Sequence, residues 1–258
     1  MKTTDNTILI TGGGSGIGRG LAEAFHALGN QVVIAGRRQK TLDAATDANP
    51  GMKSLTLDIA DAESIRTFAA QVAEAYPQLN VLINMAGIMR NERLREQKEP
   101  LADMEETIAT NLLGPLRLTA ALLPMLEKQP NATVMNVTSG LAFVPLAMTP
   151  TYCATKAAIH SYTQSLRYQM KDTSVEVLEL VPPYVQTELL GERQANDPTA
   201  MPLSDYIAEV MQIITTQPEA TEICVERVKA QRFAERSGDY DTFFKNFNDA
   251  MAKARLGE

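Results

Sequence analysis

Short runs of β-branched and other apolar residues alternate with amphipathic helical patterns along most of this 258-residue chain. Several of these runs are apolar throughout, which is typical of strands that helices cover on both faces. We therefore predict an α/β fold with a doubly wound parallel sheet in three layers, α/β/α. Strands are expected at 7–11, 31–35, 53–58, 81–84, 133–137, 175–180 and 222–225, and helices at about 17–29, 39–48, 62–76, 104–127, 152–170 and 204–216.

The bulk properties exclude several classes of protein. A chain of this length with 45% hydrophobic residues can bury one large core, so we expect a single domain over residues 1–258. The net charge of −7, without a Lys/Arg-rich run, argues against nucleic acid or an anionic membrane as the main partner. The apolar run at the N-terminus is too short for a signal peptide, and no stretch is expected to span a membrane, so we expect a cytoplasmic protein.

The cysteine and histidine content predicts no metal site. Two cysteines, Cys153 and Cys224, cannot make a disulfide framework, and they form no ligand cluster with His26 and His160. Cys153 is interpreted as a small core residue. His160 is interpreted as an ordinary packed or surface histidine, and a proton relay through it is the less favoured alternative.

A glycine-rich loop follows the first expected strand. Thr11–Gly18 joins this strand to a helical pattern that begins at Ile17, and the spacing of its glycines is G-x-x-x-G-x-G. Glycines permit a tight turn and a close approach of the backbone, so the helix N-terminus can face a pyrophosphate, as in Rossmann-type folds. The loop therefore predicts a dinucleotide site; a turn without a ligand is the alternative.

Two arginines follow the second expected strand. An acidic residue at this place would accept the adenosine ribose hydroxyls of NAD, but Arg37 and Arg38 stand here after Gly36. Guanidinium groups can bind a 2′-phosphate, so NADP is favoured over NAD. The alternative is that both arginines are solvated loop charges.

Tyr152 and Lys156 lie one helical turn apart, where residues share a face. A positive charge beside a phenol favours the ionised form, which suits a general acid/base. Such a pair can also arise by chance on a helix surface. The other motifs of the chain must decide whether Tyr152 and Lys156 form a proton-transfer pair or an ordinary surface pair.

In combination, these motifs resemble the classical short-chain dehydrogenase/reductase family over about residues 6–190. Asn84-Met-Ala-Gly87 follows the fourth strand, Asn111 lies in the expected helix at 104–127, and Ser139 ends the strand before Tyr152 and Lys156. Asp58 after the third strand and the segment Pro182–Thr187 also resemble family elements. The stretch Val181–Glu188 is similar to a bacterial branch related to the oxidoreductases of D-alanylation operons.

The resemblance implies an NADP(H)-dependent oxidoreductase that transfers a hydride between the nicotinamide and a ketone or secondary alcohol. Tyr152 would be the general acid/base, and Ser139 would hydrogen-bond the substrate oxygen. Lys156 would depress the pKa of Tyr152 and bind the nicotinamide ribose, and Asn111 would hold a water that links Lys156 to solvent. The implied cofactor-binding residues are Gly12, Ser15, Gly16, Ile17, Gly18, Arg37, Arg38, Asp58, Ile59, Asn84, Ala86, Gly87, Tyr152, Lys156, Pro182, Val185 and Thr187.

Three positions depart from the family pattern. Met85 replaces the second Asn of the element after the fourth strand, with little expected effect on chemistry. Pro183 replaces a glycine and stiffens the loop after Pro182. Ser15 stands where many NADP-preferring members have a basic residue, which leaves the preference to Arg37 and Arg38.

The expected substrate is a neutral or hydrophobic carbonyl or alcohol, because Gly140–Leu146 is apolar. The polar, turn-rich segment at about 184–203 is expected to be a substrate lid, and residues at about 226–258 a C-terminal helical extension. A homodimer or homotetramer would pair the outer faces of helices 104–127 and 152–170. An NAD-linked dehydrogenase and a low-turnover NADP(H)-sensing binding protein remain the alternative functions.

Overall fold

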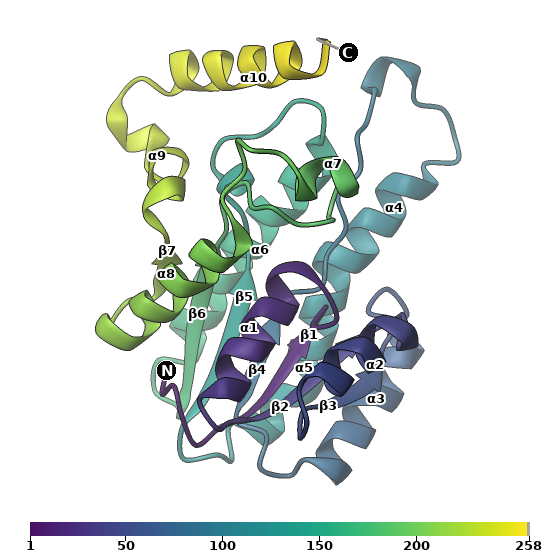
Figure 1. The fold of residues 1–258 in the computed structure, drawn as a ribbon, viewed down its shortest axis with the longest axis vertical. Helices are drawn as coiled ribbons and strands as arrows, with labels where there is room; N and C mark the ends of the chain where they lie inside the picture. The colour runs from purple at the N-terminus through teal and green to yellow at the C-terminus, as the bar shows by residue number, and fades with distance from the viewer. Residues whose placement is uncertain (257–258) are drawn as a thin grey trace.

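The computed structural model describes residues 1–256, with side chains described through Lys253 (Figure 1). Within these residues a single parallel sheet has the strand order β3-β2-β1-β4-β5-β6-β7. This confirms the predicted Rossmann-type, doubly wound fold. The strands are β1 (Thr7–Thr11), β2 (Gln31–Gly36), β3 (Lys53–Thr56), β4 (Val81–Asn84), β5 (Ala132–Val137), β6 (Val175–Val181) and β7 (Glu222–Cys224).

The helices that follow these strands lie close to the expected ranges. They are α1 (Gly16–Ala27), α2 (Gln39–Ala48), α3 (Ala62–Ala75), α4 (Ala102–Ile108), α5 (Gly114–Leu126), α6 (Pro150–Gln169) and α8 (Leu203–Thr216). The expected helix at 104–127 is divided, because a π-helical segment, η2 (Ala109–Leu113), stands between α4 and α5. A π-helical turn occupies only a few residues inside a helix, and this run is apolar on both sides of it, so the sequence pattern does not reveal the turn.

The core has two parts, one on each face of the sheet. Side chains alternate along a strand, so Ile8 and Ile10 of β1 face one side and Leu9 faces the other, and all three are fully buried. Residues of α1, α2 and α8 cover the first face, and residues of α3, α5 and α6 cover the second. This arrangement gives the three layers and leaves the carboxyl ends of the strands open for a site.

One helical run is long and apolar enough to cross a membrane by length and composition alone, contrary to the sequence expectation. It spans Ala102–Leu126, the α4-η2-α5 segment. Leu118, Leu122 and Leu126 on this run are buried in the second part of the core. The same apolar composition is therefore explained by packing against the sheet.

The chain beyond β6 is mostly helical. The segment after β6 contains the short helix α7 (Glu192–Ala195), and α9 (Lys229–Arg232) and α10 (Tyr240–Leu256) follow β7. In Figure 1, α10 runs across the top of the molecule, above α6 and α7. Residues 257–258 of the expected extension lie outside the described residues. The 3₁₀ segments are η1 (Leu94–Glu96), η3 (Gly140–Ala142), η4 (Glu226–Val228) and η5 (Ala234–Ser237).

Candidate active site

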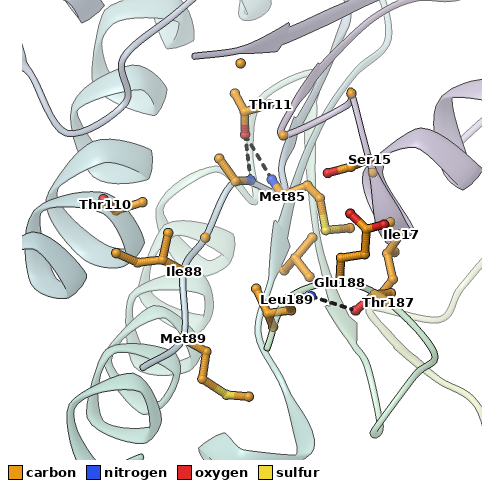
Figure 2. Close-up of a pocket in the computed structure, with 18 of the residues that line it drawn as sticks. Thr11, Ser15, Ile17, Met85, Ile88, Met89, Thr110, Thr187, Glu188 and Leu189 are labelled. Carbon is orange, nitrogen blue, oxygen red and sulfur yellow. Dashed lines mark hydrogen bonds between the residues drawn. The ribbon is translucent and has the colours of Figure 1, made fainter. Parts of the chain in front are cut away.

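A cavity of about 540 Å³ lies at the carboxyl ends of the strands. Loops after β1, β2, β4, β5 and β6 line it, so it spans the point where the strand order reverses between β1 and β4. In doubly wound folds ligands bind in this crevice. Figure 2 shows this pocket, with Ser15 and Ile17 on one side and Ile88 and Met89 across from them.

The glycine loop turns so tightly that a side chain at Gly18 would clash with the backbone of the loop. Gly12 has a φ of +69°, and a Cβ atom at Gly18 would lie 2.3 Å from the carbonyl oxygen of Gly12. Thr11 fixes the neighbouring loop, because its Oγ1 accepts hydrogen bonds from the backbone N–H of Met85 and of Ala86, each at 3.0 Å (Figure 2). Thr11 therefore holds Met85, which replaces the second Asn of the family element, through its backbone N–H and not through its side chain.

The N-terminus of α1 faces the same cavity with free backbone donors. Its N-cap, Ser15, makes no side-chain hydrogen bond to the helix, and the first turn contains no acidic residue. Gly12, Ser15, Gly16, Ile17 and Gly18 all line the cavity. A helix N-terminus with unsatisfied N–H groups favours a bound anion such as a phosphate.

Arg37 and Arg38 line the end of the cavity beyond β2. The side chain of Arg37 is 49% exposed, and its Nη1 lies 3.3 Å from Oε1 of Glu106 on α4. Glu106 also accepts a hydrogen bond from Arg90, and this bond holds the pKa of the Glu106 carboxyl below its usual range. The sequence did not predict Glu106 as a partner, because it lies 69 residues from Arg37.

The remaining residues expected at the cofactor divide into two groups. Ile59, Ala86, Gly87, Pro182, Val185 and Thr187 line the cavity. The Asp58 carboxylate instead accepts a hydrogen bond from the backbone N–H of Ala60 at 3.0 Å. Asn84 is buried and donates to Thr119 and Asn136, so it holds β4 against its neighbours. Asp58 and Asn84 do not line the cavity, and their contact with a cofactor stays a prediction.

Ser139 and Tyr152 meet at the inner end of the cavity. Both are buried, each 7% exposed. Ser139 Oγ accepts a hydrogen bond from the backbone N–H of Leu141 at 3.1 Å. Burial raises the pKa of the Tyr152 phenol well above its ordinary value, and a side-chain hydrogen bond with Ser139 partly opposes this effect. The phenol therefore holds its proton at neutral pH.

Lys156 lies beside this pair, also buried. Its Nζ donates to the carbonyl oxygen of Val137 at 2.8 Å and lies 5.6 Å from the centre of the Tyr152 ring. Burial lowers the pKa of the Lys156 ammonium to about 8. Desolvation has the largest effect on the pKa of both groups, so the depression of the Tyr152 pKa by Lys156 stays a prediction.

Asn111 lies in η2, at the interruption between α4 and α5. Its side chain is bonded to both backbone groups of Ile88: Oδ1 accepts from the N–H and Nδ2 donates to the carbonyl, each at 2.8 Å. Asn111 therefore ties the loop after β4 to the helix. It does not line the cavity, so a water-holding role stays a prediction.

Apolar residues line part of the cavity and pack around Tyr152. Met89, Pro183 and Leu189 line the cavity. The Tyr152 ring packs in a cluster with Leu146 and Cys153, and Phe247 and Met251 of α10 pack against this cluster. Cys153 is buried, as predicted.

Two anchors near these residues were missed by sequence reasoning. Asn248 of α10 accepts from the backbone N–H of Ala147 at 2.7 Å and donates to the carbonyl of Pro145 at 3.1 Å. Gln194 of α7 donates to the carbonyl of Val185 at 2.8 Å and to Thr187 Oγ1 at 3.1 Å. Phe243, Phe247 and Met251 recur at helical spacing, which indicates that α10 packs one face against the protein. The spacing does not indicate which surface α10 packs against.

Known proteins are similar to this chain in sequence and in fold. The family model described as short chain dehydrogenase matches residues 6–198. The uncharacterized oxidoreductase DltE of Bacillus subtilis (strain 168) is 40% identical over 251 residues, 96% of this chain and 98% of that protein. A short-chain dehydrogenase structure from Streptomyces avermitilis has a TM-score of 0.77 at 26% identity, covering 98% of this chain and 96% of the other.

A closed form of serine dehydrogenase complexed with NADP⁺ is also similar, with a TM-score of 0.74 at 25% identity over 84% of this chain and 92% of the other. The family match, the relative at 40% identity and the parallel sheet agree with one another. The chain therefore belongs to the short-chain dehydrogenase/reductase family and is an oxidoreductase of that family.

Proposed function

We propose that this protein is an NADP(H)-dependent oxidoreductase that reduces a ketone or oxidises the corresponding secondary alcohol. The observation that carries the proposal is the pairing of two sites in one cavity. A glycine loop and two arginines lie at one end, and buried Ser139, Tyr152 and Lys156 lie at the other. This arrangement provides an anion site and a proton-transfer group within one ligand's length.

The residues present fit a phosphorylated dinucleotide. The glycine loop turns tightly, because a Cβ atom at Gly18 would meet the carbonyl oxygen of Gly12, and α1 directs its unsatisfied N–H groups toward the cavity. Arg37 and Arg38 would hold a 2′-phosphate, which is the support for NADP over NAD. The bound nicotinamide would supply or accept the hydride. The similar serine dehydrogenase carries NADP⁺ in its structure.

Tyr152 would supply the proton in reduction. Its raised pKa keeps the phenol protonated, so a carbonyl oxygen that reaches Oη meets a donor. Ser139 would hydrogen-bond the same oxygen and stabilise the charge that develops on it. Lys156, with a pKa of about 8, could return a proton to this site near neutral pH.

The substrate would be neutral and apolar on the side that faces the protein. Met89, Pro183 and Leu189 give part of the cavity an apolar lining, while the charged residues Arg90 and Glu188 also line it. Phe247 and Met251 pack against the cluster around Tyr152. We propose that residues 184–203 form a lid, with Gly191 at a bend where φ is +91°. The chain would be one cytoplasmic domain that assembles into a homodimer or homotetramer.

A screen of carbonyl compounds tests the proposal. Purified protein is mixed with NADPH or NADH and a panel of ketones that are apolar, polar or charged, and both cofactor consumption and alcohol formation are followed. We expect turnover with apolar ketones and faster turnover with NADPH. NADPH binding without turnover on any member of the panel would contradict the proposed oxidoreductase activity and favour a nucleotide-sensing protein.

A further inference from the structure

A buried carboxylate is hydrogen-bonded to Thr138, the residue that precedes Ser139. Glu179 of β6 is fully buried, and its carboxylate accepts a hydrogen bond from Thr138 Oγ1 at 2.7 Å. Its two oxygens lie 2.8 and 3.0 Å from Nδ1 of His160 on α6. Desolvating a carboxylate costs several kcal/mol unless it is paired, so both partners are needed for Glu179 to stand there.

The Glu179–His160 pair contacts the chain on both sides of Ser139. Thr138 immediately precedes Ser139, and its backbone N–H is also bonded to the carbonyl of Leu180 at 2.9 Å. On the other side, the His160 ring packs edge-on against Phe143, with ring centres 4.7 Å apart. Both ends of the short segment that carries Ser139 are therefore fixed by the same pair.

The helix that carries the pair also carries the reactive side chains. His160 follows Lys156 by one turn of α6 and Tyr152 by two turns. A rigid helix thus sets the position of Tyr152 directly and the position of Ser139 through His160. The relative placement of these two hydroxyls therefore depends in part on α6.

The C-terminal extension closes the remaining side of this segment. The guanidinium of Arg232 lies 4.4 Å from the centre of the Phe143 ring and binds Glu222 at 2.6 and 2.8 Å. A Cβ atom at Gly140 would lie 2.4 Å from Oε1 of Gln231, so the extension packs directly on the residue after Ser139.

The residues His160, Glu179 and Glu222 could together ligate a metal ion, but their ligand atoms already have partners in the protein. Among the described residues, His160, Glu179 and Glu222 are the one group of His, Cys, Asp or Glu whose ligand atoms lie within 4.8 Å of one another. Arg232 already engages both oxygens of Glu222, and Thr138 and His160 engage Glu179. Arg232 supplies the positive charge that an ion would bring.

We infer that Glu179 and His160 are positioning residues that hold Ser139 Oγ toward Tyr152 and the substrate oxygen. They touch no reacting atom themselves and act through the segment from Thr138 to Phe143. The inference rests on the proposed function only for its kinetic consequence, because the positioning of the Ser139 segment is a structural property of the chain.

Amide hydrogen exchange tests the positioning without any substrate. In Glu179→Leu, exchange at residues 138–144 should rise at least about tenfold, while the strands β1 and β4 keep their protection. Glu179→Gln retains an acceptor for Thr138 and His160, so it should restore most of the protection. Glu176→Leu, on the same strand but at the surface, is the matched control. Unchanged exchange at residues 138–144 in Glu179→Leu would overturn the inference.

Kinetics test whether the pair acts through Ser139. In Glu179→Leu, kcat for an active ketone should fall about 10- to 100-fold, because a misplaced group loses alignment, while the NADPH Kd changes less than about twofold. In a Ser139→Ala background the same change should have almost no further effect. An equal loss in both backgrounds would show that Glu179 does not act through Ser139.

A second pair of variants covers the case in which Glu179→Leu does not fold. His160→Leu deletes the imidazole, and His160→Asn keeps a nitrogen donor near Nδ1. Increased exchange at residues 138–144 is expected in the Leu variant and partial rescue in the Asn variant; equal protection in both would overturn the inference. Wild-type protein that shows no turnover would count against the proposed function alone, since the exchange result stands independently.

Discussion

Lys156 is buried with its ammonium on the carbonyl of Val137, and burial brings its pKa from the ordinary value of 10.5 down to about 8. The folded protein therefore binds fewer protons than the unfolded chain between pH 8 and pH 10.5. By linkage, this group makes the free energy of unfolding rise with pH in that window, by up to about 1.4 kcal/mol per pH unit. Below pH 8 the cost of the buried charge is present in full.

Replacing Lys156 with Met should remove this pH dependence. Burial raises the pKa of Tyr152 and of Cys153, so these two groups make the free energy of unfolding fall as the pH rises further. Both groups are present in wild type and in Lys156→Met, so they do not contribute to the difference between the two proteins. Urea unfolding of wild type and Lys156→Met should therefore give a stability difference that moves in favour of wild type from pH 8 toward pH 10. A difference that stays constant with pH would show that the ammonium is not desolvated.

Arg37 is the residue that carries the proposed cofactor preference. Arg37→Ala should weaken NADPH binding about tenfold, because a charge-assisted hydrogen bond to a phosphate is lost, and should leave NADH binding within about twofold. Calorimetric titration of both cofactors measures the two affinities. Arg37 is also paired with Glu106, so Glu106→Gln should strengthen NADPH binding modestly. An unchanged NADPH-to-NADH ratio in Arg37→Ala would refute the assignment.

At the scale of single elements, α10 packs against the cluster around Tyr152 through Phe247 and Met251, and we expect this packing to support the substrate side of the cavity. Asn248→Ala removes both hydrogen bonds to residues 145–147, each with a net contribution of about 0.5–1.5 kcal/mol. Hydrogen exchange over residues 240–253 should rise about tenfold, and the KM for apolar ketones should increase.

A matched change on the outer face of α10 separates docking from helix propensity. Lys245 is exposed and pairs with Asp249 one turn along the same helix. Lys245→Ala should leave both exchange and KM close to wild type. If both variants behave alike, α10 does not support the substrate side of the cavity.

The elements were largely predictable, because strands with a buried apolar run and helices with an apolar stripe carry their periods in the sequence. The site residues Ser139, Tyr152 and Lys156 were predictable because their spacing matches a motif and the topology brings them to the cavity. The Glu179–His160 pair was not found, because no local pattern links a strand to a helix. A signal was present: Glu179 interrupts an apolar strand, and a buried carboxylate requires a partner.

At the scale of the whole molecule, the two sets of site residues come from distant parts of the sequence but from nearby strands of one sheet. The glycine loop after β1 and the serine after β5 are brought together by the reversal of strand order. The C-terminal extension then covers the same end through α9 and α10.

We expect the chain to assemble through the outer faces of α4, α5 and α6. Leu113 and Tyr168 are exposed there, and exposed apolar side chains on long helices favour a symmetric interface. Light scattering should give two or four times the mass of one chain. Leu113→Asp should shift the mass toward the monomer, whereas Leu94→Asp, exposed outside these helices, should not. A monomeric wild type would contradict this expectation.

The central claim is that the chain reduces a ketone with a proton from Tyr152, and a single-turnover comparison of wild type with Tyr152→Phe tests it most directly. NADPH binding is first measured by the fluorescence of the cofactor, then an excess of enzyme–NADPH is mixed with an active ketone. We predict NADPH affinities within about twofold and a hydride-transfer rate at least about 10²-fold lower in Tyr152→Phe. Equal rates in the two proteins would contradict the account.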